Sequence, residues 1–446
     1  GSRCGSSGSL QTARRRYNRN PENPSTAGGI SRLSDTELSE KSVIKPAGIR
    51  NHFRLLVRFV CLIAAVLCLL PIGDKYGLMV LVPALSSFVA VTSILAAKTF
   101  RPLLALGLIT GLVALCRHRW FCRWVCPMGL CLDGASSLGK RFKRKPCQTM
   151  PIGRWLLTLT LGGAILGCPL FLWCDPLALF SGVFLLTEQH QLLAGAVSFL
   201  FITLMMILSL LRPHVWCRGL CPLGAFQDLL SIISRSVRSA FRPATEQANS
   251  NHSGHPVARR TVLGLLVGAA SASILRFTNS KPSRPLRPPG ALDELTFKGL
   301  CTRCGNCIRS CPHDIIRRDT GEHGFTGILT PVLTFDENYC REDCNRCTLV
   351  CPSKALVGVD LDSKQDIQIG MAQVDMNLCL LGEDRECSAC MRWCPYNAVR
   401  YVFSEAEYML VPVIDAAKCN GCGACEVACP TSPRKAIRVF PNVDIS

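Results

Sequence analysis

The sequence predicts an α-helical transmembrane bundle built from a duplicated two-helix unit, followed by a smaller α+β domain organised around clustered cysteines. Long apolar runs continue to residue 277, and sixteen of the 28 cysteines follow between Cys301 and Cys429. Charge divides at the same place, because residues 291–446 hold only 16 of the 50 basic residues but 21 of the 31 acidic ones. Basic residues flank the apolar runs, as in membrane proteins, and no aromatic-interleaved basic patch suggests a nucleic-acid partner.

The first 278 residues are expected to hold a tail and five membrane spans. Residues 1–50 are rich in Ser, Asn, Arg and Gly, which predicts a disordered basic tail. A polytopic membrane domain is expected over 51–245, and a further segment over 256–278. The expected spans are 53–71, 102–116, 155–173, 191–211 and 256–277.

Loop charge predicts the topology of these spans. Residues 1–58 carry 11 basic residues, the loop 117–154 carries nine and the loop 212–260 carries seven, whereas 173–191 carries none. The three basic segments are therefore expected in the cytoplasm and 173–191 outside. This requires the apolar run 77–97 to be interfacial or re-entrant, with 102–116 as the span.

Two short motifs repeat at the ends of expected spans. Cys122-x3-Cys126-Pro127 and Cys217-x3-Cys221-Pro222 start 95 residues apart, and each follows an apolar run. Each motif is preceded by a Pro-containing apolar segment, near Pro83 in the first copy and Pro176 in the second. A same-sense duplication predicts a pseudo-two-fold axis along the membrane normal, which would bring the two motifs together.

The segment before the second domain has two possible interpretations. Arg259-Arg260 stand directly before a Gly/Ala-rich apolar run, which resembles a twin-arginine export signal. An ordinary fifth helix with a basic cytoplasmic flank is the alternative. Both interpretations place the chain that follows outside, after a Pro-rich linker over 279–296.

The domain over 297–446 contains four cysteine motifs, each ending in Cys-Pro. Three close cysteines suit one [4Fe–4S] cube, and the trailing cysteine suits a neighbouring one, so four clusters and a double bacterial-ferredoxin-like fold are expected. Zinc is the competing interpretation, but zinc sites use pairs of Cys-x2-Cys. The motifs are Cys301, Cys304, Cys307, Cys311; Cys340, Cys344, Cys347, Cys351; Cys379, Cys387, Cys390, Cys394; and Cys419, Cys422, Cys425, Cys429.

On these motifs, residues 256–440 resemble the NapG-type four-cluster ferredoxins of periplasmic nitrate reductase systems. Residues 53–240 resemble their NapH-type polytopic partner, through Trp120-Phe121-Cys122, Trp216-Cys217 and Asp175-Pro176-Leu177. NosR-type and CcoG-type accessory proteins share this membrane pattern. The resemblance therefore implies a fusion of two subunits in one chain.

The resemblance also implies how the motifs share clusters. Motifs one and four would form one cluster pair, and motifs two and three the other. Cys429 would then complete the cube of Cys301, Cys304 and Cys307, and Cys311 that of the fourth motif.

The membrane motifs supply four further thiolates, from Cys122, Cys126, Cys217 and Cys221. One shared [4Fe–4S] cube is the simplest hypothesis. Two clusters completed by other ligands, with Cys131 and Cys147 as candidates, and no cluster at all are the alternatives. Glu188 and His190, outside the membrane, are weaker candidates for accepting quinol protons.

No nucleotide loop, flavin motif or haem Cys-x-x-Cys-His is present, so the chain is expected to carry electrons rather than to catalyse a reaction of its own. We expect it in the bacterial inner membrane, in contact with lipid, passing electrons from the quinol pool or a cytoplasmic donor to a periplasmic reductase or cytochrome. A maturation factor for a respiratory metalloenzyme and a regulatory redox sensor are the rival hypotheses.

Overall fold

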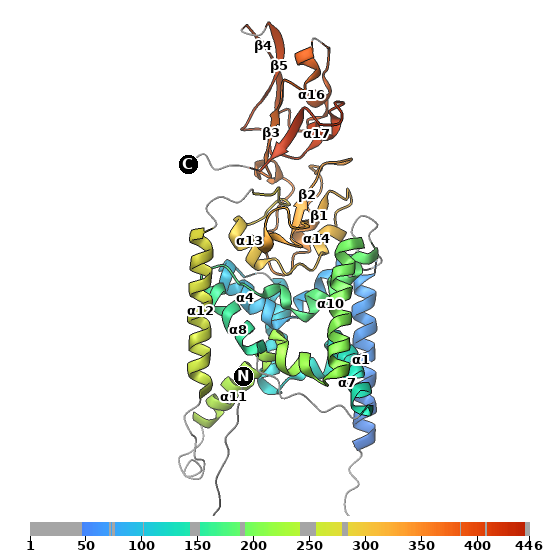
Figure 1. Cartoon of the computed structure of the whole chain (residues 1–446), viewed down its shortest axis with the longest axis vertical. Coiled ribbons are helices and arrows are strands. Elements are labelled where there is room, and N and C mark those ends of the chain that lie inside the picture. Colours follow the sequence, from blue (N-terminus) through green and yellow to red (C-terminus); the bar gives the residue numbers. More distant parts are fainter. Residues whose placement is uncertain are drawn as a thin grey trace, which may run out of the picture. The chain divides into compact units, whose positions relative to one another are not determined.

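The computed structural model describes residues 47–70, 73, 76–100, 102–142, 152–187, 192–240, 256–278, 284–383, 385–405 and 408–441 (Figure 1). The chain divides into two units, Gly1–Asn51 and His52–Ser446. Of the first unit, only the start of α1 (Ala47–Leu69) is described. The predicted disordered tail therefore lies outside the described residues, apart from its last four.

Two described helices, α1 and α12 (Pro256–Thr278), are long and apolar enough to cross a membrane. A third candidate is the pair formed by η1 with α3 (Leu78–Ala84) and α4 (Ser87–Ala97), which is bent by 88°. Such a bend occurs in broken spans and in re-entrant loops, and it falls in the run 77–97, for which the sequence predicts an interfacial or re-entrant segment. Shorter apolar stretches are α5 (Pro102–Cys116), α8 (Ile152–Ile165), α9 (Pro176–Val183) with η3 (Phe184–Thr187), and the part Gly195–Leu211 of α10 (Leu192–Leu211).

The span expected over 155–173 is wrong in its second half, because α8 ends at Ile165. Gly167 has a φ of 78°, and the N–H groups of Gly167 and Cys168 bond back to Ala164 and Gly163. This is the Schellman arrangement that ends helices, and Pro169 cannot continue the helix. The chain then forms a turn and a short 3-10 helix, Leu172–Cys174.

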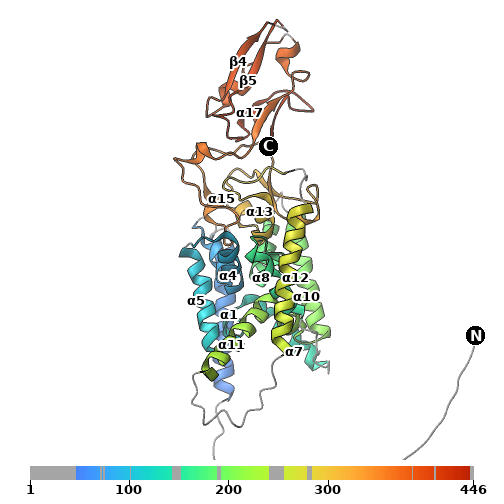
Figure 2. The same ribbon diagram turned by 90° about the vertical axis from the view of Figure 1, so that its left-hand side faces the viewer.

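The apolar helices pack in pairs, and α12 lies along α8 (Figure 2). A Cβ added at Gly162 of α8 would stand 2.2 Å from the carbonyl oxygen of Leu265 on α12, so the two backbones approach closely there. Small residues permit such approach between helices in membranes. Each Cys-x3-Cys-Pro motif is followed by a further helix, α7 (Pro127–Arg141) or α11 (Pro222–Ala240).

The C-terminal part is built from short elements, in agreement with the predicted α+β class. Its strands form three antiparallel pairs: β1 (Ile316–Arg318) with β2 (Pro331–Leu333), β3 (Met371–Val374) with β6 (Ile437–Phe440), and β4 (Val399–Ser404) with β5 (Met409–Ile414). Its helices are α13 (Glu294–Leu300), α14 (Asn306–Arg309), α15 (Arg346–Leu349), α16 (Ala389–Trp393) and α17 (Ala424–Ala428).

This part begins earlier than the expected linker end at residue 296. Arg287 forms an ion pair with Glu294, and the carbonyl oxygen of Leu286 accepts a hydrogen bond from the N–H of Leu333. Residues 286–296 therefore belong to the packed part of the chain.

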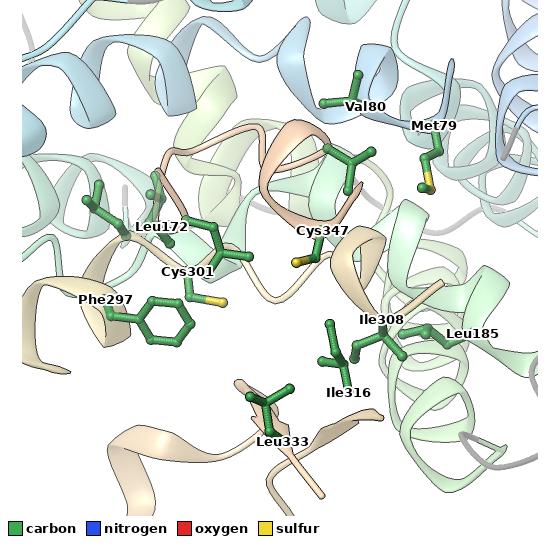
Figure 3. Packing of buried hydrophobic residues seen from close by; sticks show 14 of the residues in the cluster. Met79, Val80, Leu172, Leu185, Phe297, Cys301, Ile308, Ile316, Leu333 and Cys347 are labelled. Carbon is green, nitrogen blue, oxygen red and sulfur yellow. The ribbon is translucent and has the colours of Figure 1, made fainter. Parts of the chain in front are cut away.

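One hydrophobic core connects the apolar helices with the cysteine-rich part. Figure 3 shows residues of both on its two sides, among them Met79 and Leu172 from the helices and Phe297 and Cys301 from the C-terminal part. Two buried side chains of α14 donate across the junction, Asn306 to the carbonyl of Met79 at 3.3 Å and Arg309 to that of Leu69 at 2.6 Å. The cysteine-rich part is therefore seated on the helices by specific contacts.

Candidate metal centres

Four cavities in the C-terminal part are each lined by four cysteines. In every cavity, three cysteines come from one motif and the fourth is the trailing cysteine of another. The sets are Cys301, Cys304, Cys307, Cys351; Cys311, Cys340, Cys344, Cys347; Cys379, Cys387, Cys390, Cys429; and Cys394, Cys419, Cys422, Cys425.

These sets correct the pairing that the family resemblance implied. Cys351, not Cys429, joins Cys301, Cys304 and Cys307, so motifs one and two exchange their trailing cysteines, as do motifs three and four. The reason lies in the short helices, because α14 packs against α15 and α16 against α17. Each trailing cysteine closely follows its helix, so the helix pairs decide which cavity it enters.

Loop geometry distinguishes the first and fourth motifs from the other two. Gly305 and Gly423, which precede α14 and α17, have φ values of 79° and 86°. Asn345 and Ser388 occupy the same place before α15 and α16 with φ values of −130° and −132°. The tight Cys-x2-Cys-x2-Cys loop thus passes through a left-handed residue, for which glycine is the natural choice, whereas the longer motifs do not.

The donor chemistry of these cavities fits iron–sulfur clusters. Burial raises the pKa of Cys301 to about 11 and that of Cys422 to about 12, so free thiols here would stay protonated at neutral pH. Metal binding deprotonates a coordinating thiol outright. Backbone N–H groups of Leu356 and Ala398 already point at the sulfurs of Cys351 and Cys394, at 3.4 and 3.3 Å.

A single metal ion fits less well. In the described part of the chain, no three His, Cys, Asp or Glu side chains converge on a point that could hold one ion. The four thiols of each set stand around a space instead, which is what a cluster bound through several irons requires.

The cavities follow one another in a row. The N–H of Cys340, in the second set, donates to the carbonyl oxygen of Cys422, in the fourth set, at 2.9 Å. Cys307 of the first set lies within electrostatic reach of Cys347 of the second, and Cys425 of the fourth within reach of Cys390 of the third. The set of Cys301 lies next to the apolar helices, and the set of Cys379 is at the other end.

The structure also brings together the four cysteines of the membrane motifs. Burial raises the pKa of Cys126 and Cys221, and charge on Cys122 or Cys217 would raise both further, so the four thiols lie near one another. The N–H of Gly129 donates to Cys126 and that of Gly224 to Cys221, both at 3.4 Å.

Among the other candidate residues, only Cys131 lies in the described part of the chain. Cys131 is half-buried on α7, five residues beyond Cys126. Cys147, Glu188 and His190 lie outside the described residues.

The residue before each motif contacts the aspartate on the helix that follows the other motif. Arg119 and His214, each three residues before the first cysteine of its motif, have φ values of 51° and 64°. Arg119 pairs with Asp228 of the second motif's helix at 2.6 Å, and His214 lies 3.6 Å from Asp133 of the first. The helices follow the same rule, because α5 packs against α11 and α10 against α7.

The segment Asp175-Pro176-Leu177 occupies a buried junction. Asp175 is fully buried and caps α9 by accepting hydrogen bonds from the N–H groups of Leu177 and Ala178. Ser86, which caps α4, donates to the same carboxylate at 2.6 Å. The starts of α4 and α9, 89 residues apart in sequence, therefore meet at one carboxylate.

Two of these site residues could have been found from the sequence. Asp133 and Asp228 each lie 11 residues after the first cysteine of their motif, so the repeat itself marks them. Ser86, Asn306 and Arg309 carry no comparable sequence signal, because their partners are a distant side chain and two backbone carbonyls.

These cavities and their cysteines define a ferredoxin-type iron–sulfur protein. The family described as 4Fe-4S dicluster domain matches residues 300–355 and 385–432, and that described as 4Fe-4S binding domain matches 99–146 and 193–239. The chain is 35% identical to the methylamine utilization ferredoxin-type protein MauM of Methylobacillus flagellatus over 192 residues, 41% of this chain and 77% of MauM.

Two further relatives come from Escherichia coli. The ferredoxin-type protein NapG is 32% identical over 192 residues, 41% of this chain and 81% of NapG. The ferredoxin-type protein NapF is 30% identical over 167 residues, 37% of this chain and 93% of NapF. The chain belongs to this family of ferredoxin-type proteins. No solved structure matches it.

Proposed function

We propose that the chain is a membrane-anchored electron carrier that takes electrons from quinol or a cytoplasmic donor and delivers them to a periplasmic reductase. One observation supports this most directly: the row of cysteine cavities starts against the apolar helices and continues away from them. The ferredoxin-type names of the relatives agree with electron transfer.

In this proposal, the sixteen cysteines of the four cavities and the four membrane-motif cysteines hold [4Fe–4S] clusters, five in all. Bound clusters would take up and release single electrons. The chain's own groups keep the thiolates in place: short helices fix each trailing cysteine, backbone N–H groups donate to sulfur, and nine of the twenty cysteines are buried while the other eleven are partly buried.

We further propose that the helical half is a duplicated multi-pass unit. Support comes from the two separate matches to the 4Fe-4S binding domain, from the crosswise packing of α5, α7, α10 and α11, and from the crosswise polar pairs. The basic loops favour a cytoplasmic side for the membrane motifs, and Arg259-Arg260 favour a periplasmic C-terminal part.

A deletion strain tests the electron-carrier role. Deleting the gene should stop electron flow to the partner reductase while that reductase keeps its full metal content. Complementation with the natural chain should restore the flow, and complementation with a Cys126→Ala,Cys221→Ala chain should not. A reductase that lacks its metal in the deletion strain would instead support a maturation factor.

A further inference from the structure

The membrane-motif cysteines receive one side-chain hydrogen bond that the repeat does not duplicate. Gln227 on α11 is completely buried, and its Nε2 donates to the sulfur of Cys122 at 3.4 Å. Gln227 belongs to the second motif's helix and Cys122 to the first motif, so this contact crosses between the two copies. It places an amide dipole directly at one of the four sulfurs.

The equivalent position in the first copy is Leu132. Both residues lie ten positions after the first cysteine of their motif, and each directly precedes the aspartate that lies 11 positions after that cysteine, Asp228 or Asp133. Leu132 is buried, with 1% of its surface exposed, and it cannot donate to sulfur. Within the described residues, Cys217 correspondingly receives no side-chain hydrogen bond on its sulfur.

A packing role does not account for Gln227. Its Oε1 is buried and has no hydrogen-bond partner among the described residues, which destabilises the fold. Leucine at the equivalent position of the other copy is part of the hydrophobic core, so the repeat itself does not require an amide at this position. The amide is therefore costly for stability, and among the described residues the one polar contact of its Nε2 is with the sulfur of Cys122.

Hydrogen bonds to cluster sulfurs are among the factors that set reduction potentials. When a centre takes up one electron, its thiolates become more negative, so a donor at the sulfur stabilises the reduced state. A single donor also makes the Cys122 side of a shared centre differ from the Cys217 side.

We propose that Gln227 is a positioning residue that raises the reduction potential of the centre held by Cys122, Cys126, Cys217 and Cys221 and makes its two halves unequal. This rests on the proposed function, because it requires a cluster at these four cysteines.

The test is a redox titration of the full chain in which electron paramagnetic resonance monitors the reduced clusters. The signal of the membrane centre is obtained by subtracting the signal of a Cys126→Ala,Cys221→Ala chain from that of the natural chain. Gln227→Leu should shift the midpoint potential to more negative values and change the anisotropy of the signal, with unchanged iron content. The matched variant Leu132→Gln should shift the potential the opposite way, and the double exchange should return it toward the natural value.

The outcomes separate this proposal from the proposed function. A natural chain with no difference signal from the four cysteines overturns the cluster at the membrane motifs and, with it, the role of Gln227. A natural signal together with an unchanged potential in Gln227→Leu overturns only the role of Gln227. If Gln227→Leu loses its iron, Gln227→Met and Leu132→Gln decide: opposite shifts in potential support the proposal, and no shift in either variant refutes it.

Discussion

Arg119 and Asp228 form a two-pronged ion pair in which Nε and Nη2 of the guanidinium each lie 2.6 Å from one carboxylate oxygen. Arg119 also donates to the carbonyl oxygen of Cys217 at 3.0 Å. Because Arg119 precedes the first membrane motif and Asp228 follows the second, this pair fastens the two motifs to each other.

Replacing Asp228 by Asn should therefore loosen the membrane site. Both side chains are largely buried, at 18% and 15% exposure, and breaking such a pair costs about 3 kcal/mol. Thermal unfolding in detergent should occur at lower temperature, and about four irons per chain should be lost. Arg119→Lys should have a similar, smaller effect, since lysine cannot form the two-pronged contact.

The exposed pair Arg385–Glu383 provides the matched control. It spans 3.9 Å with side chains 67% and 59% exposed, so Glu383→Gln should cost less than about 1 kcal/mol. Equal effects of Asp228→Asn and Glu383→Gln would speak against a fastening role for Arg119 and Asp228.

Iron counts in double cysteine variants test how the motifs share clusters. Cys301→Ala and Cys351→Ala affect the same cavity, so the double variant should lose about four irons, no more than either single variant. Cys301→Ala with Cys429→Ala affects two cavities and should lose about eight. The reverse pattern would restore the pairing that the family resemblance implied.

The buried junction at Asp175 should be sensitive to charge and shape. Asp175→Ala removes the acceptor of Ser86 and of two backbone N–H groups, which should destabilise the helical half by about 3 kcal/mol. Asp175→Asn keeps one acceptor oxygen and should cost less. The control is Asp293→Ala at the exposed cap of α13, with an expected cost of about 1 kcal/mol; a larger loss there than at Asp175 would refute the assignment.

The contact of Arg309 with Leu69 should hold the cysteine-rich part on the helices. Arg309→Met removes a buried donor, and amide hydrogen exchange should become faster both around Leu69 and in α14. Arg317→Met is the control, because Arg317 is 39% exposed and pairs with the exposed Asp336. Exchange that changes only in α14 would mean that the junction does not depend on Arg309.

Much of this arrangement follows from local spacing. Three close cysteines on a short loop face one cavity wherever the loop lies, so the core of each set was predictable from its motif. The approach of Cys122 to Cys217 was likewise predictable from the repeat, because equivalent residues of a duplicated unit meet near its axis.

Two features depend on long-range packing, which the sequence does not predict. The entry of Cys351 rather than Cys429 into the cavity of Cys301 depends on α14 packing against α15, which no spacing encodes. The contact of Ser86 with Asp175 depends on two helix starts that are far apart in sequence. The early end of α8 had a local sign, since Gly167 and Pro169 interrupt the apolar run.

The most direct test of the central claim is the iron and acid-labile sulfide content of the purified full chain, measured beside the Cys126→Ala,Cys221→Ala variant. Five clusters predict about 20 irons and an equal amount of sulfide per chain, falling to about 16 in the variant. About 16 irons in both chains would contradict a cluster shared by the two membrane motifs.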